Sequence, residues 1–180
     1  MKKTLLAIIL SGGAIMATNA SANTGTVNFT GKVTSATCDI VPEVNGAQVA
    51  SIDLGIATLT QNGNPVDFKL KASGANAADC LAKTSARIEW SGDMNTQGFN
   101  NLATTSAAEG FHMVLRATNG GTGSAGANIT SNYTAVDYNI ANGISSFDYR
   151  ATLTKSGTAP QNGYKAGLFN AAASFVVTYL

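Results

Sequence analysis

The chain has 180 residues and a formal net charge of +1, and only 12% of its residues are charged, about half the usual share. It offers no basic field for nucleic acid or anionic lipid, so we expect no nucleic-acid partner. Most of the surface must then consist of Ser, Thr, Asn and Gly. A sparsely charged surface suits close contact either with copies of the chain or with a sugar, and the composition does not distinguish these two partners.

Residues 1–22 have the pattern of a secretory signal peptide, with an N-terminal core helix as the alternative. A basic start at Lys2 and Lys3 precedes a mostly apolar stretch, and residues 20–22 (Ala-Ser-Ala) fit a small-x-small cleavage site. No later stretch has the roughly 18 apolar residues of a membrane helix. We therefore expect an exported chain that begins at Asn23.

The first strand is predicted over residues 26–34. Val27, Phe29 and Val33 alternate with polar residues, and Gly31 falls on the apolar face. Glycine weakens an isolated strand, so this is either an ordinary first strand with a bulge or an extension whose small residue must fit against another backbone. The segment alone leaves both interpretations open.

Cys38 and Cys80 are the two cysteines of the chain. An even number in an exported protein predicts a disulfide, which stabilises by roughly 4 kcal/mol in the chain-entropy model for a loop of this length. A metal site is the rival interpretation, but the chain has one histidine and no CxxC spacing, so we expect no metal.

The remaining mature chain predicts one all-β domain. Further strands are expected over residues 49–54, 66–71, 86–91, 111–118, 133–140, 147–154 and 168–179, separated by turns rich in Gly, Asn and Pro. A short helix is expected within residues 75–82. Many short strands favour a sandwich or barrel, although Trp90 lies after Cys80 and so departs from the antibody pattern.

The sequence contains no recognisable catalytic constellation. His112 and Arg116 share a face of a predicted strand without a nucleophile, and hydrolase, phosphate-loop and dinucleotide motifs are missing. Paired carboxylates stay open, because any fold can bring two together. We expect neither catalysis nor a cofactor, and we expect His112 to be a surface or interface residue.

The C-terminal segment carries the longest alternating pattern of the chain. Its odd positions are all apolar: Phe169, Ala171, Ala173, Phe175, Val177 and Tyr179. Such a pattern predicts one long strand with one buried face. Because it reaches the penultimate residue, we expect its free edge to stay uncovered, and exposed edges recruit other chains. The N-terminal segment of one copy is suited to cover this edge in the next.

Four features of the chain occur together. They are the run Gly25–Val33 with Cys38 seven residues after Gly31, the second cysteine Cys80, the strand end Ile52-Asp53-Leu54-Gly55, and Gly167 fourteenth from the end with Tyr179 penultimate. On these residues the whole chain resembles the major subunits of enterobacterial chaperone–usher fimbriae (pili). It is most similar to those of adhesive fimbriae from enterotoxin-producing livestock strains.

The resemblance implies an incomplete immunoglobulin-like β-sandwich that lacks its last strand. A periplasmic chaperone lends a strand to the groove, and the N-terminal extension of the next subunit then replaces it. The implied organisation is a signal peptide (1–22), a donor-strand extension (23–34) and a pilin domain (35–180). The implied partners are copies of itself, the chaperone, an outer-membrane usher and minor subunits, in a fimbria at the bacterial surface.

By the same resemblance, four residues of the donor strand enter the neighbour's groove: Val27, Phe29, Gly31 and Val33. The groove and chaperone-binding strand comprises Gly167, Phe169, Ala171, Ala173, Phe175, Val177 and Tyr179. This head-to-tail contact does not close on itself, so it generates an open helical filament.

The resemblance also implies a second function, the binding of sialylated host glycolipids by the subunit itself. Some relatives use basic residues in the region before an Ala-Pro pair, which here is residues 154–158 before Ala159-Pro160. This stretch holds one lysine and no arginine. Lys155 is therefore the candidate contact to a host glycoconjugate.

Overall fold

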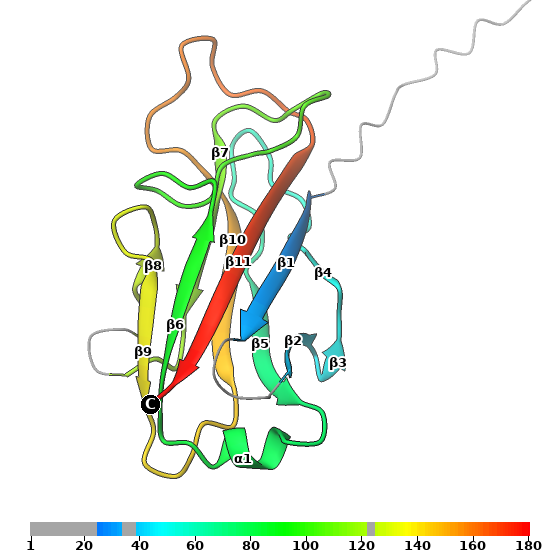
Figure 1. Cartoon of the computed structure of the whole chain (residues 1–180). Coiled ribbons are helices and arrows are strands. Elements are labelled where there is room, and N and C mark those ends of the chain that lie inside the picture. Colours follow the sequence, from blue (N-terminus) through cyan, green and yellow to red (C-terminus); the bar gives the residue numbers. More distant parts are fainter. Residues whose placement is uncertain (1–24, 34–38, 122–124) are drawn as a thin grey trace, which may run out of the picture.

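The computed structural model describes residues 25–33, 39–121 and 125–180. They form two β-sheets packed as a sandwich, with one short helix at its end in the described part of the chain (Figure 1). The predicted signal peptide and Cys38 lie outside the described residues.

The first sheet has five strands in the order β4-β1-β11-β6-β9. Their bounds are Gly25–Val33 for β1, Ser51–Asp53 for β4, Ser85–Gly92 for β6, Ala135–Asn139 for β9 and Phe169–Tyr179 for β11. Neighbouring strands are antiparallel except for β1 and β11, which are parallel over all nine residues of β1.

The second sheet has six antiparallel strands in the order β3-β2-β5-β10-β7-β8. Their bounds are Asp39–Val44 for β2, Ala47–Gln48 for β3, Val66–Ser73 for β5, Phe111–Ala117 for β7, Asn128–Ile129 for β8 and Phe147–Lys155 for β10. Helix α1, Ala77–Leu81, connects the sheets. Within the described ranges no helix has the length and apolar character of a membrane span.

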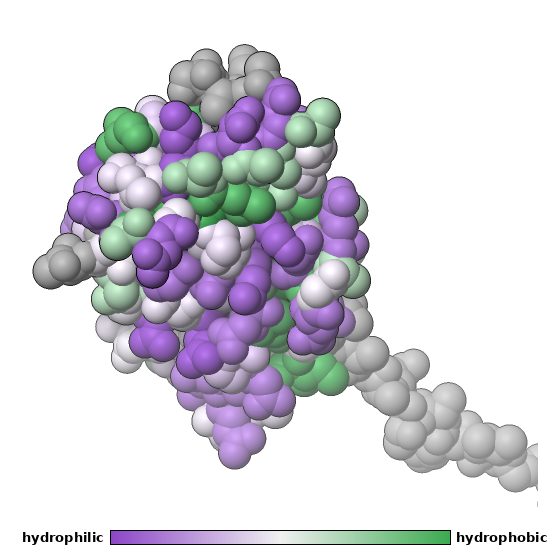
Figure 2. Space-filling view, turned by 90° about the horizontal axis from the view of Figure 1, so that it is seen from below, coloured by the Kyte–Doolittle hydropathy of each residue, from purple (hydrophilic) through white to green (hydrophobic). Residues whose placement is uncertain are grey.

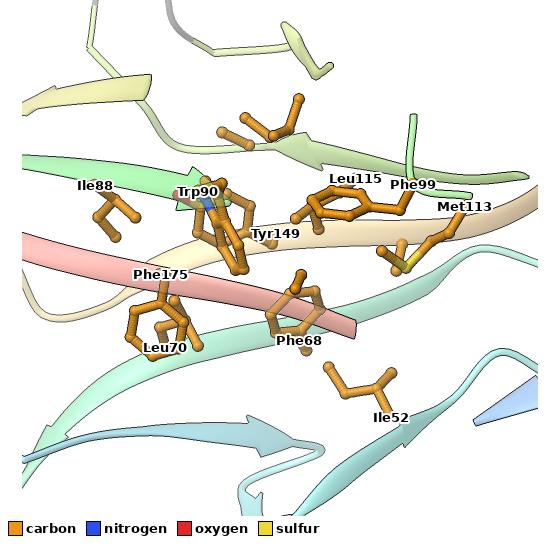
Figure 3. Packing of buried hydrophobic residues seen from close by; sticks show 14 of the residues in the cluster. Ile52, Phe68, Leu70, Ile88, Trp90, Phe99, Met113, Leu115, Tyr149 and Phe175 are labelled. Atoms are coloured by element: carbon orange, nitrogen blue, oxygen red, sulfur yellow. Dashed lines mark hydrogen bonds between the residues drawn. The ribbon is translucent and has the colours of Figure 1, made fainter. Parts of the chain in front are cut away.

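The core lies between the sheets and is built by strand alternation. Buried and exposed residues alternate along β6 and over most of β10 and β11. At the centre, the Trp90 indole N–H donates to the Tyr149 hydroxyl at 3.1 Å, and its ring lies 5.4 Å from that of Phe175 (Figure 3). Each large apolar side chain buried in this way contributes about 1.5–3 kcal/mol to stability.

The sandwich and all eight predicted strands are confirmed, with ends that differ by a few residues, and the predicted helix contains α1. The sequence did not predict β2, β3 and β8. Pro42 argues against a strand at β2, because proline has no backbone N–H to donate to a neighbouring strand. The structure accommodates it because the pairing of β2 with β3 involves only Glu43 and Val44, which follow the proline. Strands β3 and β8 have two residues each, too few to show a period.

Candidate functional site

The candidate site is the core-facing strip of β11 together with the strand that covers its edge. Phe169, Ala171, Ala173, Phe175 and Val177 are each at most 3% exposed, while Tyr179 and Gly167 are half-buried. The alternation predicted for this segment is therefore present, with exposed or half-buried residues at the outward positions. A side chain added at Gly167 would collide with the backbone of Ser106 and Ala107, so this position requires glycine.

One edge of β11 is paired along its whole length. Strand β6 pairs with residues 173–179, and the loop after β6 continues the pairing toward the start of β11. The Leu102 N–H donates to the Asn170 carbonyl at 2.7 Å, and the Asn101 amide donates to the Leu168 carbonyl at 2.8 Å. Asn101 is a structural residue of the site that no motif in the sequence indicated.

The opposite edge of β11 is covered by the chain's own N-terminal segment. Strand β1 lies between β11 and β4, as Figure 1 shows, with Gly31 opposite Phe175 and Val33 opposite Val177. Its contact with β4 is short, from the Thr26–Asp53 pair to the Asn28–Ser51 pair. Without β1, one edge of β11 would be uncovered over a nine-residue stretch and its backbone groups on that edge would be unpaired, which is the arrangement that binds an added strand.

An apolar hollow lies at the end of the sandwich where β11 begins. A cavity of about 30 Å³ is lined by apolar and small residues that include Ala57, Phe111, Leu153, Gly167 and Phe169. Leu59 also lines it and is 44% exposed. The opposite end of the sandwich, seen in Figure 2, is mostly hydrophilic with scattered apolar patches.

Lys155, the candidate receptor contact, lies at the end of β10, in the sheet opposite β11. Its ammonium group stacks over the Tyr164 ring, 4.2 Å from the centroid, and its backbone N–H donates to Asn62 at 2.9 Å. Lys165 and Glu109 form an ion pair in the same region of the chain. The structure therefore does not bring Lys155 together with the groove residues.

His112 was expected to be a surface or interface residue, and in the subunit it is not a surface residue, while the interface role stays a prediction. The side chain is 5% exposed, and this burial lowers its pKa below the ordinary value. The turn at Gly98 packs against the ring, and its Nδ1 lies 3.4 Å from the Ser156 hydroxyl. Segments distant in sequence cover the outer face of β7 here, which no local pattern predicts. His112 is therefore a packing residue.

A polar hollow on the outer face of the second sheet was not predicted. It has a volume of about 310 Å³ and contains Arg116 and Arg150, which lie opposite each other on β7 and β10. The Arg150 guanidinium donates to both carboxylate oxygens of Asp67, at 2.6 and 2.8 Å, and this hydrogen bonding lowers the pKa of Asp67. In the part of the chain that the structure describes, no cluster of His, Cys, Asp and Glu forms a metal site.

Cys80 is buried on α1 and is one half of a disulfide. Because Cys38 lies outside the described residues, its pairing with Cys80 stays a prediction. The side chains of Val27, Phe29, Gly31 and Val33 are likewise not described, and their role as donor residues stays a prediction.

Comparison with known proteins gives full-length relatives. The sequence is 61% identical to the K99 fimbrial protein of Escherichia coli over 183 residues, covering all of both chains. It is 31% identical to the F107 fimbrial protein of the same species, covering 98% of this chain and 99% of the relative. No family model matches the sequence.

The fold has a counterpart among solved structures. The crystal structure of the P pilus rod subunit PapA covers 81% of this chain and 92% of its own, with a TM-score of 0.54 and 22% identity. That structural similarity supports the incomplete immunoglobulin-like sandwich, whereas the assignment to a family rests on the two sequence relatives. The chain belongs to the family of chaperone–usher fimbrial major subunits of enterobacteria.

Proposed function

We propose that this fimbrial subunit polymerises by donor-strand exchange, in which the segment Gly25–Val33 of one copy pairs with β11 of the next. The observation that supports this proposal is how the two edges of β11 are paired. One edge is held by β6 and its loop, whereas the other is covered by a segment from the opposite end of the chain. A segment that lies between β11 and β4 but contacts β4 through only three residue pairs is suited to exchange between copies.

The proposal extends to the partners of assembly. A nine-residue edge between β11 and β4 would be exposed in any subunit whose β1 has left. Such an edge aggregates unless another strand covers it. A periplasmic chaperone fills this role before assembly, an outer-membrane usher receives the subunit, and minor subunits complete the filament on the bacterial surface.

The test is deletion of residues 23–33, with the signal peptide retained. We expect the deleted subunit to be recovered with its chaperone and to form no filaments, by size-exclusion chromatography and electron microscopy. The matched control is Gln161→Ser, a change at an exposed loop residue. Normal filaments from the deletion variant would rule out strand exchange.

Attachment to host cells is the proposed role of the filament. Direct binding of a sialylated glycolipid by this subunit is a second candidate, which rests on Lys155. Lys155 is half-buried, and its ammonium group already contacts the Tyr164 ring, so an acidic sugar would have to compete with this contact. We therefore place this role below the structural one.

A further inference from the structure

A single row of polar side chains crosses the outer face of the second sheet. The strand register sets Asn128 of β8 opposite Arg116 of β7, and Arg116 opposite Arg150 of β10. Arg150 in turn lies opposite Asp67 of β5. Like charges at directly opposite positions of neighbouring strands repel each other and destabilise a sheet. The Arg116–Arg150 pair is therefore stabilised by any negative group that lies beside it.

Only one of these two arginines has a carboxylate partner among the residues that the structure describes. Asp67 accepts two hydrogen bonds from Arg150, at 2.6 and 2.8 Å. Arg87, the third arginine of the chain, is paired with two carboxylates of the first sheet. Arg116 takes part in none of the ion pairs of the described residues. Two guanidinium groups and one carboxylate leave this row with one positive charge in excess.

The hollow of about 310 Å³ on this face lies over the row. It is lined by both arginines, by Asn128, by Thr152 and Thr154 of β10, and by two apolar residues. Its volume falls within the range of about 300–1,000 Å³ that is typical of small-molecule sites. Both arginines are half-buried, and partial removal from water strengthens their attraction for an anion. The hydroxyl and amide groups beside them suit the hydroxyls of a sugar.

The charge of the hollow selects the kind of anion. One negative charge balances the excess, and a second would be repelled by Asp67. A phosphate monoester carries about 1.5–2 negative charges at neutral pH and is less suited. A sulfate ester keeps a single charge, spread over three oxygens that accept hydrogen bonds from several donors at once. It is also weakly hydrated, as a guanidinium group is, whereas a carboxylate offers two oxygens and holds water more strongly.

We propose that this hollow binds a sulfate ester on a sugar, with Arg116 as the main contact. Arg116 donates to the sulfate oxygens, and Arg150 adds its positive charge while it stays bonded to Asp67. The site is separate from Lys155, which does not line the hollow. It also goes beyond strand exchange, because β1 and β11 belong to the first sheet and the hollow belongs to the second.

The test measures the binding of purified filaments to three surfaces. These are coated with a sulfated galactose conjugate, with the same conjugate without sulfate, and with a sialylated galactose conjugate. We expect the filaments to bind the sulfated surface at least about tenfold more tightly than the unsulfated one, as one charged hydrogen bond provides. Added salt should weaken this binding, because salt screens exposed charges.

Two variants should change the binding in opposite directions. Arg116→Gln should weaken binding to the sulfated surface about 10- to 100-fold, because the charged hydrogen bonds are lost. Asp67→Asn should tighten it, because the carboxylate that neutralises Arg150 is removed. Lys83→Gln is the matched control, since it removes one positive charge from an exposed position after α1 and should leave the binding unchanged.

Equal binding of the parent filaments to the sulfated and unsulfated surfaces would overturn the proposal. So would unchanged binding by Arg116→Gln filaments, or weaker or unchanged binding by Asp67→Asn filaments if Arg116→Gln forms none. Binding to the sialylated surface that also depends on Arg116 would show that the hollow takes a carboxylate, and would overturn the assignment to sulfate. Strand exchange is tested separately by the deletion of residues 23–33, so the two failures are distinguishable.

Discussion

At the scale of single residues, Gly31 is the small residue of β1 that lies opposite the buried Phe175 of β11. A leucine there overpacks the groove and costs about 1–3 kcal/mol. We therefore expect Gly31→Leu to fold with its chaperone and to fail to polymerise, as seen by chromatography and electron microscopy.

Thr30→Leu is the control for this change, because alternation puts position 30 on the other face of the strand. It should polymerise normally. Normal filaments from Gly31→Leu would show that Gly31 does not enter the groove, and the register would have to be moved.

Lys155 tests the receptor role at the same scale. Lys155→Ala should weaken attachment to sialylated glycolipid surfaces and leave filaments intact. Loss of the contact with Tyr164 costs about 0.5–1 kcal/mol, which the fold tolerates. Lys165→Ala, which removes the exposed partner of Glu109, is the control for charge alone. Unchanged attachment by Lys155→Ala filaments, measured on glycolipid-coated surfaces, would remove Lys155 from the receptor site.

The burial of His112 predicts that the free energy of unfolding depends on pH. Burial lowers its pKa in the folded state, so as pH falls below about 6.5 the unfolded chain takes up the proton first. The contribution of His112 is thus fully present above that pH and is lost as pH falls toward the folded-state pKa. His112→Gln should lose less unfolding free energy than the parent between about pH 7.5 and 5.5 in urea titrations. Equal losses would contradict this account.

At the scale of elements, α1, which carries Cys80, connects the two sheets, since it lies between β5 and β6. We expect Cys38 to be the partner of Cys80 and Cys38→Ala to deplete the mature protein in the periplasm. Loss of a native disulfide typically costs about 2–5 kcal/mol. Intact-mass measurement with and without thiol alkylation decides the pairing, and two free thiols in the folded protein would contradict it.

Sequence reasoning worked best where a strand has one buried face along its length. Strand β11 was predicted almost to the residue because its period of two runs unbroken from Phe169 to Tyr179. Strand β2 was missed because Pro42 breaks the pattern, and its register depends on the distant β5. The burial of His112 depends on loops far away in the chain.

The direction of β1 could not be predicted for a different reason. A period of two is the same read forward or backward, so alternation fixes which face of a strand is buried and leaves its direction open. The groove strand and the donor segment are predictions from this alternation and from the family resemblance. The parallel pairing of β1 within its own subunit comes only from the backbone.

At the scale of the whole molecule, the sandwich is complete only with a strand on the free edge of β11. A chain that lacks residues 23–33 and carries a copy of residues 24–34 after Leu180, on a flexible linker, should return that strand to the free edge of β11. We expect a stable monomer without the chaperone and a higher unfolding midpoint than the deletion alone gives, by chromatography and thermal melting. The same chain with leucine in place of the copied Gly31 is the control. Aggregation of both chains alike would show that a strand supplied from the C-terminus does not complete this fold.

The short β1–β4 contact has a consequence for how fast subunits change state. A strand held by nine residue pairs on one side and three on the other can peel away from one end, where β4 does not reach. An incoming donor can then advance along β11 as the resident strand retreats, so the backbone groups of β11 are never all exposed at once. Exchange by such stepwise displacement has a low barrier at each step, and its rate rises with the concentration of the incoming strand. Spontaneous release of β1 within one subunit is independent of that concentration.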